Sequence, residues 1–305
     1  MGGRPSLGSR VSVRYRIGGV LTDVIGMLEA LAPEVSVRPK TGAVVRIPPA
    51  DVVSMRELSA VPVRASEIRA LEHAAALAWP GTEQHWHQGW LLRAGGGYTA
   101  RANSAVPLEF SSAIAALPEI VDWYAARGLP AWLALPERLS SVREIGAGIG
   151  FKPTRVMVTD LAPGSTGSVR LEPRPNDDWL TIYERDVPSA VLGAVADGEV
   201  VFAELSGSAV GRGAVIPGPD GTRWLGISAL HVLPGRRRRG LAREVCAALQ
   251  NWGAARGATR GYVQVLVENA AAIALYESLG YRLHHHLRYV DAGALVGRSG
   301  MGRSL

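Results

Sequence analysis

The sequence predicts an α/β (α+β) fold in which two related lobes follow a small all-β barrel. Three observations support this prediction. A strand pattern, an arginine-rich loop and a helix pattern follow one another over residues 224–252. A matching order of helices, strands and glycines occurs earlier in the chain, and the first 62 residues contain only short strand patterns. Similarity between two stretches of this length indicates two related domains rather than a solenoid.

The repeat is visible at two places in each lobe. Residues 123–128, Trp-Tyr-Ala-Ala-Arg-Gly, align with residues 252–257, Trp-Gly-Ala-Ala-Arg-Gly, at an offset of 129 residues. Gly150 and Phe151 align with Gly280 and Tyr281 at an offset of 130 residues. Helix, glycine, strand, helix, Gly-aromatic pair and strand therefore recur in the same order.

Residues 1–62 are predicted to form the barrel. Residues 11–17 alternate between apolar and polar side chains, and Gly18 and Gly19 follow as a turn. Further strands are predicted over residues 24–31, 35–37, 43–47 and 52–58. The arrangement resembles Src-homology-3-like modules. Because Tyr15 is the only aromatic residue of the segment, we expect it to serve in docking or packing rather than in ligand binding.

The first lobe is predicted over residues 63–162 and the second over residues 163–290. In the first lobe we expect helices from residue 65, over 112–127 and over 142–149, and strands over 89–94, 98–106, 131–135 and 154–160. In the second we expect helices over 179–183 and 189–195 and strands over 200–205, 209–216 and 222–232. Residues 291–305 are rich in glycine, serine and arginine and are predicted to be a flexible tail.

The loop over residues 234–240 has the composition of an anion site. It contains a proline, two glycines and four consecutive arginines, and a helix with apolar residues at three- and four-residue spacing follows it. A helix start carries free N–H groups and the positive end of the helix dipole. Gly240 has no Cβ, so a bulky anion could approach the backbone there. Arginine runs are also typical of solvated surfaces and nucleic-acid contacts, so the loop alone leaves both interpretations open.

A second stretch, residues 263–281, narrows the choice. A strand runs into Asn269 as a helix N-cap, and the helix stops at Gly280. Together the two stretches resemble the GNAT superfamily of acyl-CoA-dependent N-acyltransferases, which implies central mixed sheets. The first motif matches at Arg237, Arg238, Arg239, Gly240, Leu241 and Ala242, and the second at Asn269, Ala272, Leu275, Tyr276, Gly280 and Tyr281. The second motif is especially similar to that of ribosomal-protein alanine acetyltransferases.

The resemblance implies acetyl-CoA as co-substrate and assigns a role to each matched residue. Leu230, His231 and Val232 would line the pantetheine arm, and the N–H of Val232 would stabilise the thioester oxyanion. Residues 237–242 would hold the diphosphate. Asn269 and Ala272 would contact the pantetheine from the second helix. Tyr276 would protonate the leaving thiolate, whose conjugate acid has a pKa of about 8.5, and its alternative role is core packing.

Two positions depart from the resemblance. Some alanine acetyltransferases have a glutamate base five residues before the asparagine, where this chain has Gln264, which cannot titrate. The base is therefore elsewhere, with Glu204 or Glu268 acting through water as candidates, or the amine needs none. In the first lobe, residues 107–112 contain Glu109 and no glycine, so we expect a degenerate lobe and one acetyl-CoA per chain.

Composition limits the partners. The net charge of +6 comes from arginines that are scattered outside residues 236–239, so we expect no nucleic-acid partner. One cysteine, Cys246, and no apolar stretch of membrane length predict a cytoplasmic protein. No metal is expected, because at most two of three consecutive strand histidines, residues 284–286, can share one ion. The acceptor amine is left open between a small molecule, a peptide N-terminus and a protein lysine, and a non-catalytic acyl-CoA-sensing or nucleic-acid-associated module is the alternative function.

Overall fold

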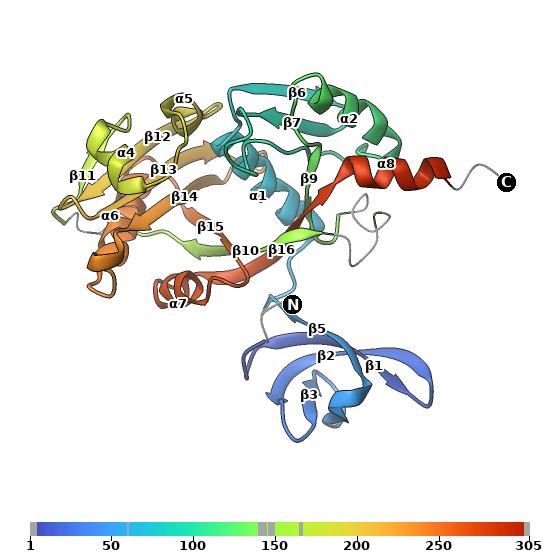
Figure 1. The fold of residues 1–305 in the computed structure, drawn as a ribbon. Helices are drawn as coiled ribbons and strands as arrows, with labels where there is room; N and C mark the ends of the chain where they lie inside the picture. Colours follow the sequence, from blue (N-terminus) through green and yellow to red (C-terminus); the bar gives the residue numbers. More distant parts are fainter. Residues whose placement is uncertain (1–4, 60, 140–144, 146–149, 165–166, 302–305) are drawn as a thin grey trace.

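The computed structural model describes residues 5–59, 61–139, 145, 150–164 and 167–301. A small β module lies beside a larger α/β body, and helix α1 (Ala65–Ala78) starts the body next to the link between them (Figure 1). The predicted fold class is confirmed: a large mixed sheet with helices forms the body, and an antiparallel sheet forms the module.

The N-terminal module is a five-stranded antiparallel sheet with the order β4-β3-β2-β1-β5. Its strands are β1 (Arg10–Ile17), β2 (Val20–Ala30), β3 (Val35–Pro39), β4 (Val45–Ile47) and β5 (Val52–Leu58). Alternate residues of β1 to β4, such as Val11, Val13 and Val37, are buried in one small core. The five strands predicted from the alternating pattern are therefore present.

The body contains an eight-stranded sheet with the order β11-β12-β13-β14-β15-β10-β16-β9. Its strands are β9 (Trp132–Pro136), β10 (Phe151–Asp160), β11 (Arg170–Glu172), β12 (Glu199–Leu205), β13 (Ala209–Pro217), β14 (Arg223–Val232), β15 (Arg260–Leu266) and β16 (Arg282–Asp291). A three-stranded sheet of β6 (Glu83–His87), β7 (Trp90–Ala94) and β8 (Val106–Pro107) lies beside it. A single parallel bridge between Ala105 and Leu133 links the two sheets at β9.

Helices cover both faces of the large sheet. They are α2 (Leu117–Ala125), α4 (Asp177–Tyr183), α5 (Ser189–Gly193), α6 (Leu241–Ala255), α7 (Ala270–Ser278) and α8 (Ala292–Met301), in addition to α1. Helices α6 and α7 pack on one apolar core, whereas α1, α4 and α5 pack on two others. No helix of the described residues is long and apolar enough to span a membrane.

The last strand of each predicted lobe lies among strands of the other lobe. Strand β10, from the first lobe, pairs with β15 and β16 of the second lobe. Strand β16, from the end of the second lobe, pairs with β10 and with β9 of the first. The predicted boundary near residue 162 therefore divides the sequence but not the sheet, which contains strands of both lobes.

The helices α2 and α6 end in the same way. Gly128 and Gly257 both adopt a left-handed backbone, with φ of 63° and 77°. The residue after each glycine donates its N–H to a carbonyl five positions earlier, from Leu129 to Tyr124 and from Ala258 to Gly253, both at 3.0 Å. These are Schellman ends, which place glycine at the left-handed position and explain why the glycine recurs in both lobes.

Several predicted elements need correction. Residues 292–301, predicted as part of a flexible tail, form α8, because Ala292 is buried and Leu295 and Val296 pack against a core that includes residues of α2. The strand predicted over residues 98–106 is mostly turn, since Asn103 fixes that loop through bonds from the N–H groups of Gly95 and Gly97 at 2.8 Å. The helix predicted over residues 142–149 lies outside the described residues except for position 145.

Candidate functional site

Strands β14 and β15 separate in the middle of the sheet. They pair in parallel only from Trp224–Arg260 to Ile227–Val263, although β14 continues to Val232. Directly after the last pair, Ala229 has a φ of 51°, and the register with β13 shifts at the same place. Such a bulge bends a strand and increases its twist, so it turns β14 away from β15. We call the space between the two strands after Ile227 and Val263 the opening.

The N–H of Val232 faces the opening. Leu233 donates its N–H to Ser208 of the loop before β13 at 3.0 Å, and Val232 lies opposite Ala209. Hydrogen-bonded and non-hydrogen-bonded pairs alternate along an antiparallel ladder. Because Leu233 bonds to Ser208, the next pair, Val232 and Ala209, exchanges no hydrogen bonds. The N–H and C=O of Val232 therefore point away from β13. In agreement, the carbonyl of Val232 accepts a bond from Nε of Arg237 at 3.1 Å.

The side chains of β14 divide between the two faces of the sheet. Leu230 and Val232 pack against the core formed with α6 and α7. His231 points to the other face, where its Nε2 lies 3.0 Å from the Glu184 carboxylate at the end of α4. The three residues predicted to line a pantetheine thus border the opening, but His231 offers it backbone rather than side chain.

The loop after β14 presents charge and free N–H groups together. The side chains of Arg236, Arg238 and Arg239 are exposed and have no hydrogen-bond or ion-pair partner in the described part of the chain. The N–H groups of residues 238–242 likewise have no acceptor within the described residues. Arg238 and Gly240 have φ values of 64° and 83°, which curve the backbone around these donors. Curved backbone with convergent N–H groups is a common anion site.

Gly240 is open to the solvent side. A Cβ added there would lie 3.9 Å from a Glu244 oxygen and would meet nothing else within 4 Å. Its left-handed backbone disfavours any other residue, and the free space leaves room for a ligand next to the start of α6. The next two residues, Leu241 and Ala242, are half-buried at the first turn of that helix.

Helix α7 borders the opening on the β15 side. The Asn269 side chain accepts the N–H of Ala272 at 3.1 Å, as predicted for an N-cap. Ala272 packs against the same core as Leu230 and Val232. The structure therefore brings the two sequence motifs together across the opening, although Asn269 lies 27 positions after Ala242 in the chain.

Tyr276 lies in the core beneath these residues. Its side chain is buried and contacts the Tyr281 ring edge-on, with ring centroids 5.6 Å apart. Burial raises the pKa of the Tyr276 phenol above its ordinary value, and the neighbouring Cys246 thiol acts in the same direction. The hydroxyl makes no hydrogen bond to a described residue. A phenol in this position keeps its proton at neutral pH.

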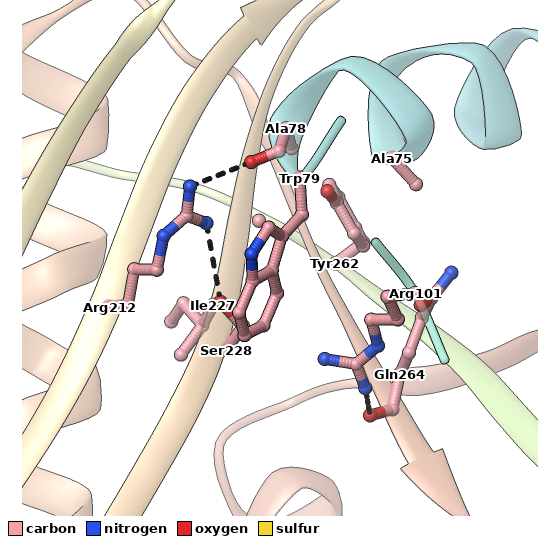
Figure 2. A pocket seen from close by; sticks show the side chains of 10 residues that line it. Ala75, Ala78, Trp79, Arg101, Arg212, Ile227, Ser228, Tyr262 and Gln264 are labelled. Carbon is pink, nitrogen blue, oxygen red and sulfur yellow. Dashed lines mark hydrogen bonds between the residues drawn. The ribbon is translucent and has the colours of Figure 1, made fainter. Parts of the chain in front are cut away.

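The opposite face of the opening contains residues that sequence reasoning missed (Figure 2). Arg101, from the loop after β7, points at the backbone carbonyl of Gln264 and donates to it. Arg212 of β13 is fully buried, and its guanidinium donates to the carbonyls of Leu192 at 2.6 Å and of Ala78 at 2.8 Å. Burial lowers the pKa of Arg212 to about 10. No local pattern marked either arginine, because their partners lie elsewhere in the chain.

The carboxylates considered as bases are not at the opening. Glu204 lies on β12, two strands from β14, and its Oε2 accepts from Arg170 at 2.7 Å. Glu268 lines a cleft of about 660 Å³ between the N-terminal module and the body, and no residue predicted to bind acetyl-CoA lines that cleft. That cleft is larger than the cavities at the opening. It is bordered by Ile273 and Glu277 of α7, and none of the residues with free N–H groups lines it.

The three consecutive histidines also differ from expectation. His284 and His285 are both buried, because the pairing of β16 with β10 shifts between Val156 and Met157. Nδ1 of His284 lies 2.8 Å from Nδ1 of His285. Among the described residues, no group of three or more His, Cys, Asp or Glu side chains is placed to hold a metal ion.

Two family models match the chain. The model described as "Probable histone acetyltransferase Rv0428c C-terminal" matches residues 65–290, which is most of the chain. The model described as "Rv0428c N-terminal Sm-like domain" matches residues 5–56. Together they cover the N-terminal module and both lobes.

Curated relatives agree with these matches. The chain is 48% identical over 294 residues to "Probable histone acetyltransferase Rv0428c" of Mycobacterium tuberculosis, covering 94% of this chain and 96% of the relative. It is 27% identical over 253 residues to "Uncharacterized N-acetyltransferase YobR" of Bacillus subtilis, covering 73% of this chain and 98% of that protein.

Solved structures show the fold. A GCN5-related N-acetyltransferase from Kribbella flavida superposes with a TM-score of 0.52 at 16% identity, covering 75% of this chain and 95% of that one. A putative GNAT-family acetyltransferase from Novosphingobium aromaticivorans gives a TM-score of 0.50 at 19% identity, covering 72% and 96%. With the family match over residues 65–290, the chain belongs to the Rv0428c family and is an acetyltransferase of the GNAT fold.

Proposed function

We propose that this protein transfers the acetyl group of acetyl-CoA to a primary amine, and that the acceptor is a lysine side chain of a protein. The observation that carries the proposal is the opening between β14 and β15, with free N–H groups at one end and the Tyr276 phenol beneath it. A thioester carried on a long polar arm fits this arrangement, because the arm can bond the unpaired edge of β14 as an extra strand would.

The residues fit the parts of acetyl-CoA. The N–H groups of residues 238–242 and the unpartnered Arg236, Arg238 and Arg239 would hold the diphosphate, with Gly240 allowing close approach. Leu230, Val232 and Ala272 would contact the pantetheine arm. Arg237 would act by holding the Val232 carbonyl, which keeps the end of β14 in place.

The chemistry needs an oxyanion donor and an acid. As the amine nitrogen bonds to the thioester carbon, negative charge develops on the carbonyl oxygen, and the Val232 N–H would stabilise it. When the carbon–sulfur bond breaks, Tyr276 would give its proton to the thiolate and regain one from the new amide nitrogen. The raised pKa of Tyr276 keeps the phenol protonated at neutral pH, so a proton is present when the sulfur leaves.

The acceptor would approach from the face of the sheet opposite α6 and α7, where α1, Arg101 and Arg212 border the opening. The name of the relative from Mycobacterium tuberculosis, a probable histone acetyltransferase, supports a protein lysine over a small amine. We place the reaction in the cytoplasm, in line with the single Cys246, which is buried in the core.

Thiol release during turnover tests the proposal. The purified protein is incubated with acetyl-CoA and, in separate reactions, a lysine-containing peptide with a blocked N-terminus, a lysine-free peptide with a free N-terminus, and spermidine. We expect the fastest release with the lysine peptide and slower release with longer acyl-CoA thioesters. Tight acetyl-CoA binding without release for any amine would contradict catalysis and favour an acyl-CoA-sensing module.

A further inference from the structure

The acceptor lysine sets a requirement that Tyr276 does not meet. A lysine ammonium has a pKa of about 10.4, so at neutral pH it must lose a proton before its nitrogen can attack. Gln264 lies on β15 at the opening, and an amide cannot take up this proton. We propose that Glu72 of α1, held in place by His285 of β16, takes up the amine proton through water. This inference rests on the proposed transfer to an amine.

Glu72 is the buried carboxylate nearest to Gln264 among the described residues. Its Oε1 lies 3.5 Å from Nε2 of Gln264 and 2.9 Å from Nε2 of His285. Only 3% of Glu72 is exposed, and it shares the buried part of α1 with the apolar residues Ile68, Leu71 and Leu77. A buried carboxylate lowers the stability of the fold unless it is paired or hydrogen-bonded. Buried ionisable groups are common at functional sites, so the position of Glu72 beside the opening supports a functional role.

Two small cavities lie in series between Glu72 and the opening. The first has a volume of about 10 Å³ and is lined by Glu72, Arg101 and Gln264 among others. The second has about 20 Å³ and is lined by Arg101, Gln264, Ile227 and Ser228 among others (Figure 2). Each is about the size that one water molecule needs, and polar groups line both. Because Arg101 and Gln264 line both cavities, waters in them would lie within reach of each other.

The histidines orient the carboxylate. Burial and the neighbouring His285 lower the pKa of His284 to about 3, so His284 is neutral and carries one ring proton. With that proton on Nδ1, which lies 2.8 Å from Nδ1 of His285, His285 accepts there and donates its Nε2 proton to Glu72. His285 is thus a positioning residue, and Glu72 is the proton acceptor.

The charges around Glu72 suit this role. Arg93 of β7 interacts favourably with the carboxylate, and Arg101 lines the same cavity. Tyr262 of β15 and Tyr289 of β16 also face Glu72, and burial raises the pKa of both phenols. The tyrosines therefore stay protonated, so neither phenol competes with Glu72 for the amine proton. Glu72 returns the proton to solvent after the product leaves.

The pH dependence of Glu72→Gln tests the proposal with the lysine peptide as acceptor. Without the base, only the small neutral fraction of the lysine reacts, so kcat/KM at about pH 7.5 should fall by about 10²-fold. The deficit should shrink as the pH approaches about 10.4, where the amine deprotonates by itself. Acetyl-CoA affinity should not change. A deficit of the same size at every pH would indicate a structural role and overturn the proposal.

A second acceptor and three variants sharpen the test. With the α-amine peptide, whose pKa is about 7.7–8.0, Glu72→Gln should lose less than about 10-fold. The exchange of both side chains, Glu72→Gln with Gln264→Glu, returns a carboxylate to the cavity and should restore most of the activity. Glu67→Gln, an exposed position of the same helix, should match the parent. If Glu72→Gln fails to fold, His285→Asn should show the same pH-dependent deficit at smaller size, and a flat deficit there would equally overturn the proposal.

The outcomes separate this inference from the function it rests on. A parent protein that acetylates none of the amines would remove the proposed function. A parent that acetylates the lysine peptide with the same pH profile as Glu72→Gln would remove only the role of Glu72.

Discussion

The corner at the end of α2 and the corner at the end of α6 are built from the same parts in the two lobes. The guanidinium of Arg127 lies 3.6 Å from the centroid of the Trp123 ring, and that of Arg256 lies 4.3 Å from the Trp252 ring. Each arginine also donates to the carbonyl of its own tryptophan, at 2.7 Å and 3.4 Å.

The same two arginines each reach the start of a strand in their own lobe. Nε of Arg127 donates to Glu83 at the start of β6, and Nε of Arg256 donates to Glu199 at the start of β12, both at 2.8 Å. Helix end, tryptophan, arginine and strand start therefore form one repeated corner. Because the corner recurs in both lobes, we infer that this end of the helix stabilises the fold of each lobe and does not form a ligand site.

The starts of the two helices differ. Before α2, the N–H groups of Leu108 and Glu109 donate to the carbonyl of Gly89, and Ser112 donates to Glu109. The first lobe thus satisfies its own backbone and places an acid there. Before α6, residues 238–242 leave their N–H groups free among arginines. The end of the helix is therefore the same in both lobes, whereas its start differs in free N–H groups and in charge.

The largest effect is expected where the lobes are joined. Arg212→Met removes the donor to buried carbonyls of α1 and α5. Each carbonyl left without a hydrogen bond costs about 1–3 kcal/mol of stability. Removal of the buried charge offsets part of this loss. We expect the free energy of unfolding to fall by about 3 kcal/mol in urea titrations. Arg212→Lys keeps the charge and should lose less. Two separate transitions in the parent would show that the lobes are independent.

The second effect concerns chemistry confined to one lobe. Tyr276→Phe removes one hydroxyl and keeps the ring, so kcat should fall by about 10²-fold while acetyl-CoA affinity stays constant. Tyr281→Phe is the matched control, because that phenol is also buried and bonds Gln250 at 3.4 Å rather than facing the thiolate. Equal turnover of parent and Tyr276→Phe would assign Tyr276 to the core.

A third effect tests the difference between the helix starts. Gly240→Val places a β-branched residue at φ 83°, so the loop should rearrange and acetyl-CoA affinity should fall by at least about 10-fold. Gly235→Ala in the same loop has open space and an ordinary φ, and it should bind as the parent does. Calorimetry should also give one acetyl-CoA per chain, and two sites would contradict the degenerate first lobe.

The smallest effect should be equal in both lobes. Arg127→Ala and Arg256→Ala each remove an exposed ion pair and a ring contact, so each should shift Tm by no more than about 2 °C. Arg127 lowers the pKa of Glu83 in the folded state, so the pair stabilises the protein at neutral pH and loses this contribution as the pH falls. Thermal scans of both variants at neutral and acidic pH would show whether the corners are equivalent.

The parts of the site that lie in short contiguous motifs could be predicted from sequence. The turn at Gly240, the cap at Asn269 and the helical position of Tyr276 each depend on residues within a few positions, and the structure places them around one opening. Their catalytic roles remain predictions. The N-terminal strands followed in the same way from their alternating pattern.

The rest of the site depends on contacts that no local pattern encodes. Glu72 and Gln264 are 192 residues apart, and Arg212 and Ala78 are 134 apart. A lone buried acid or arginine in the sequence resembles any surface charge until the fold places it. The helix of residues 292–301 was missed for the same reason, because Leu295 and Val296 become ordered by packing on the first lobe.

The pairing of β10 and β16 with strands of the other lobe has a consequence for folding during synthesis. Strand β9 emerges from the ribosome some 150 residues before its partner β16, and β10 emerges about 100 residues before β15. Neither half of the sheet can be completed before β16 is made, because β16 pairs with both β9 and β10. The nascent chain therefore carries β9 without this partner while residues 137–281 are synthesised. One strand then completes the pairing of both halves.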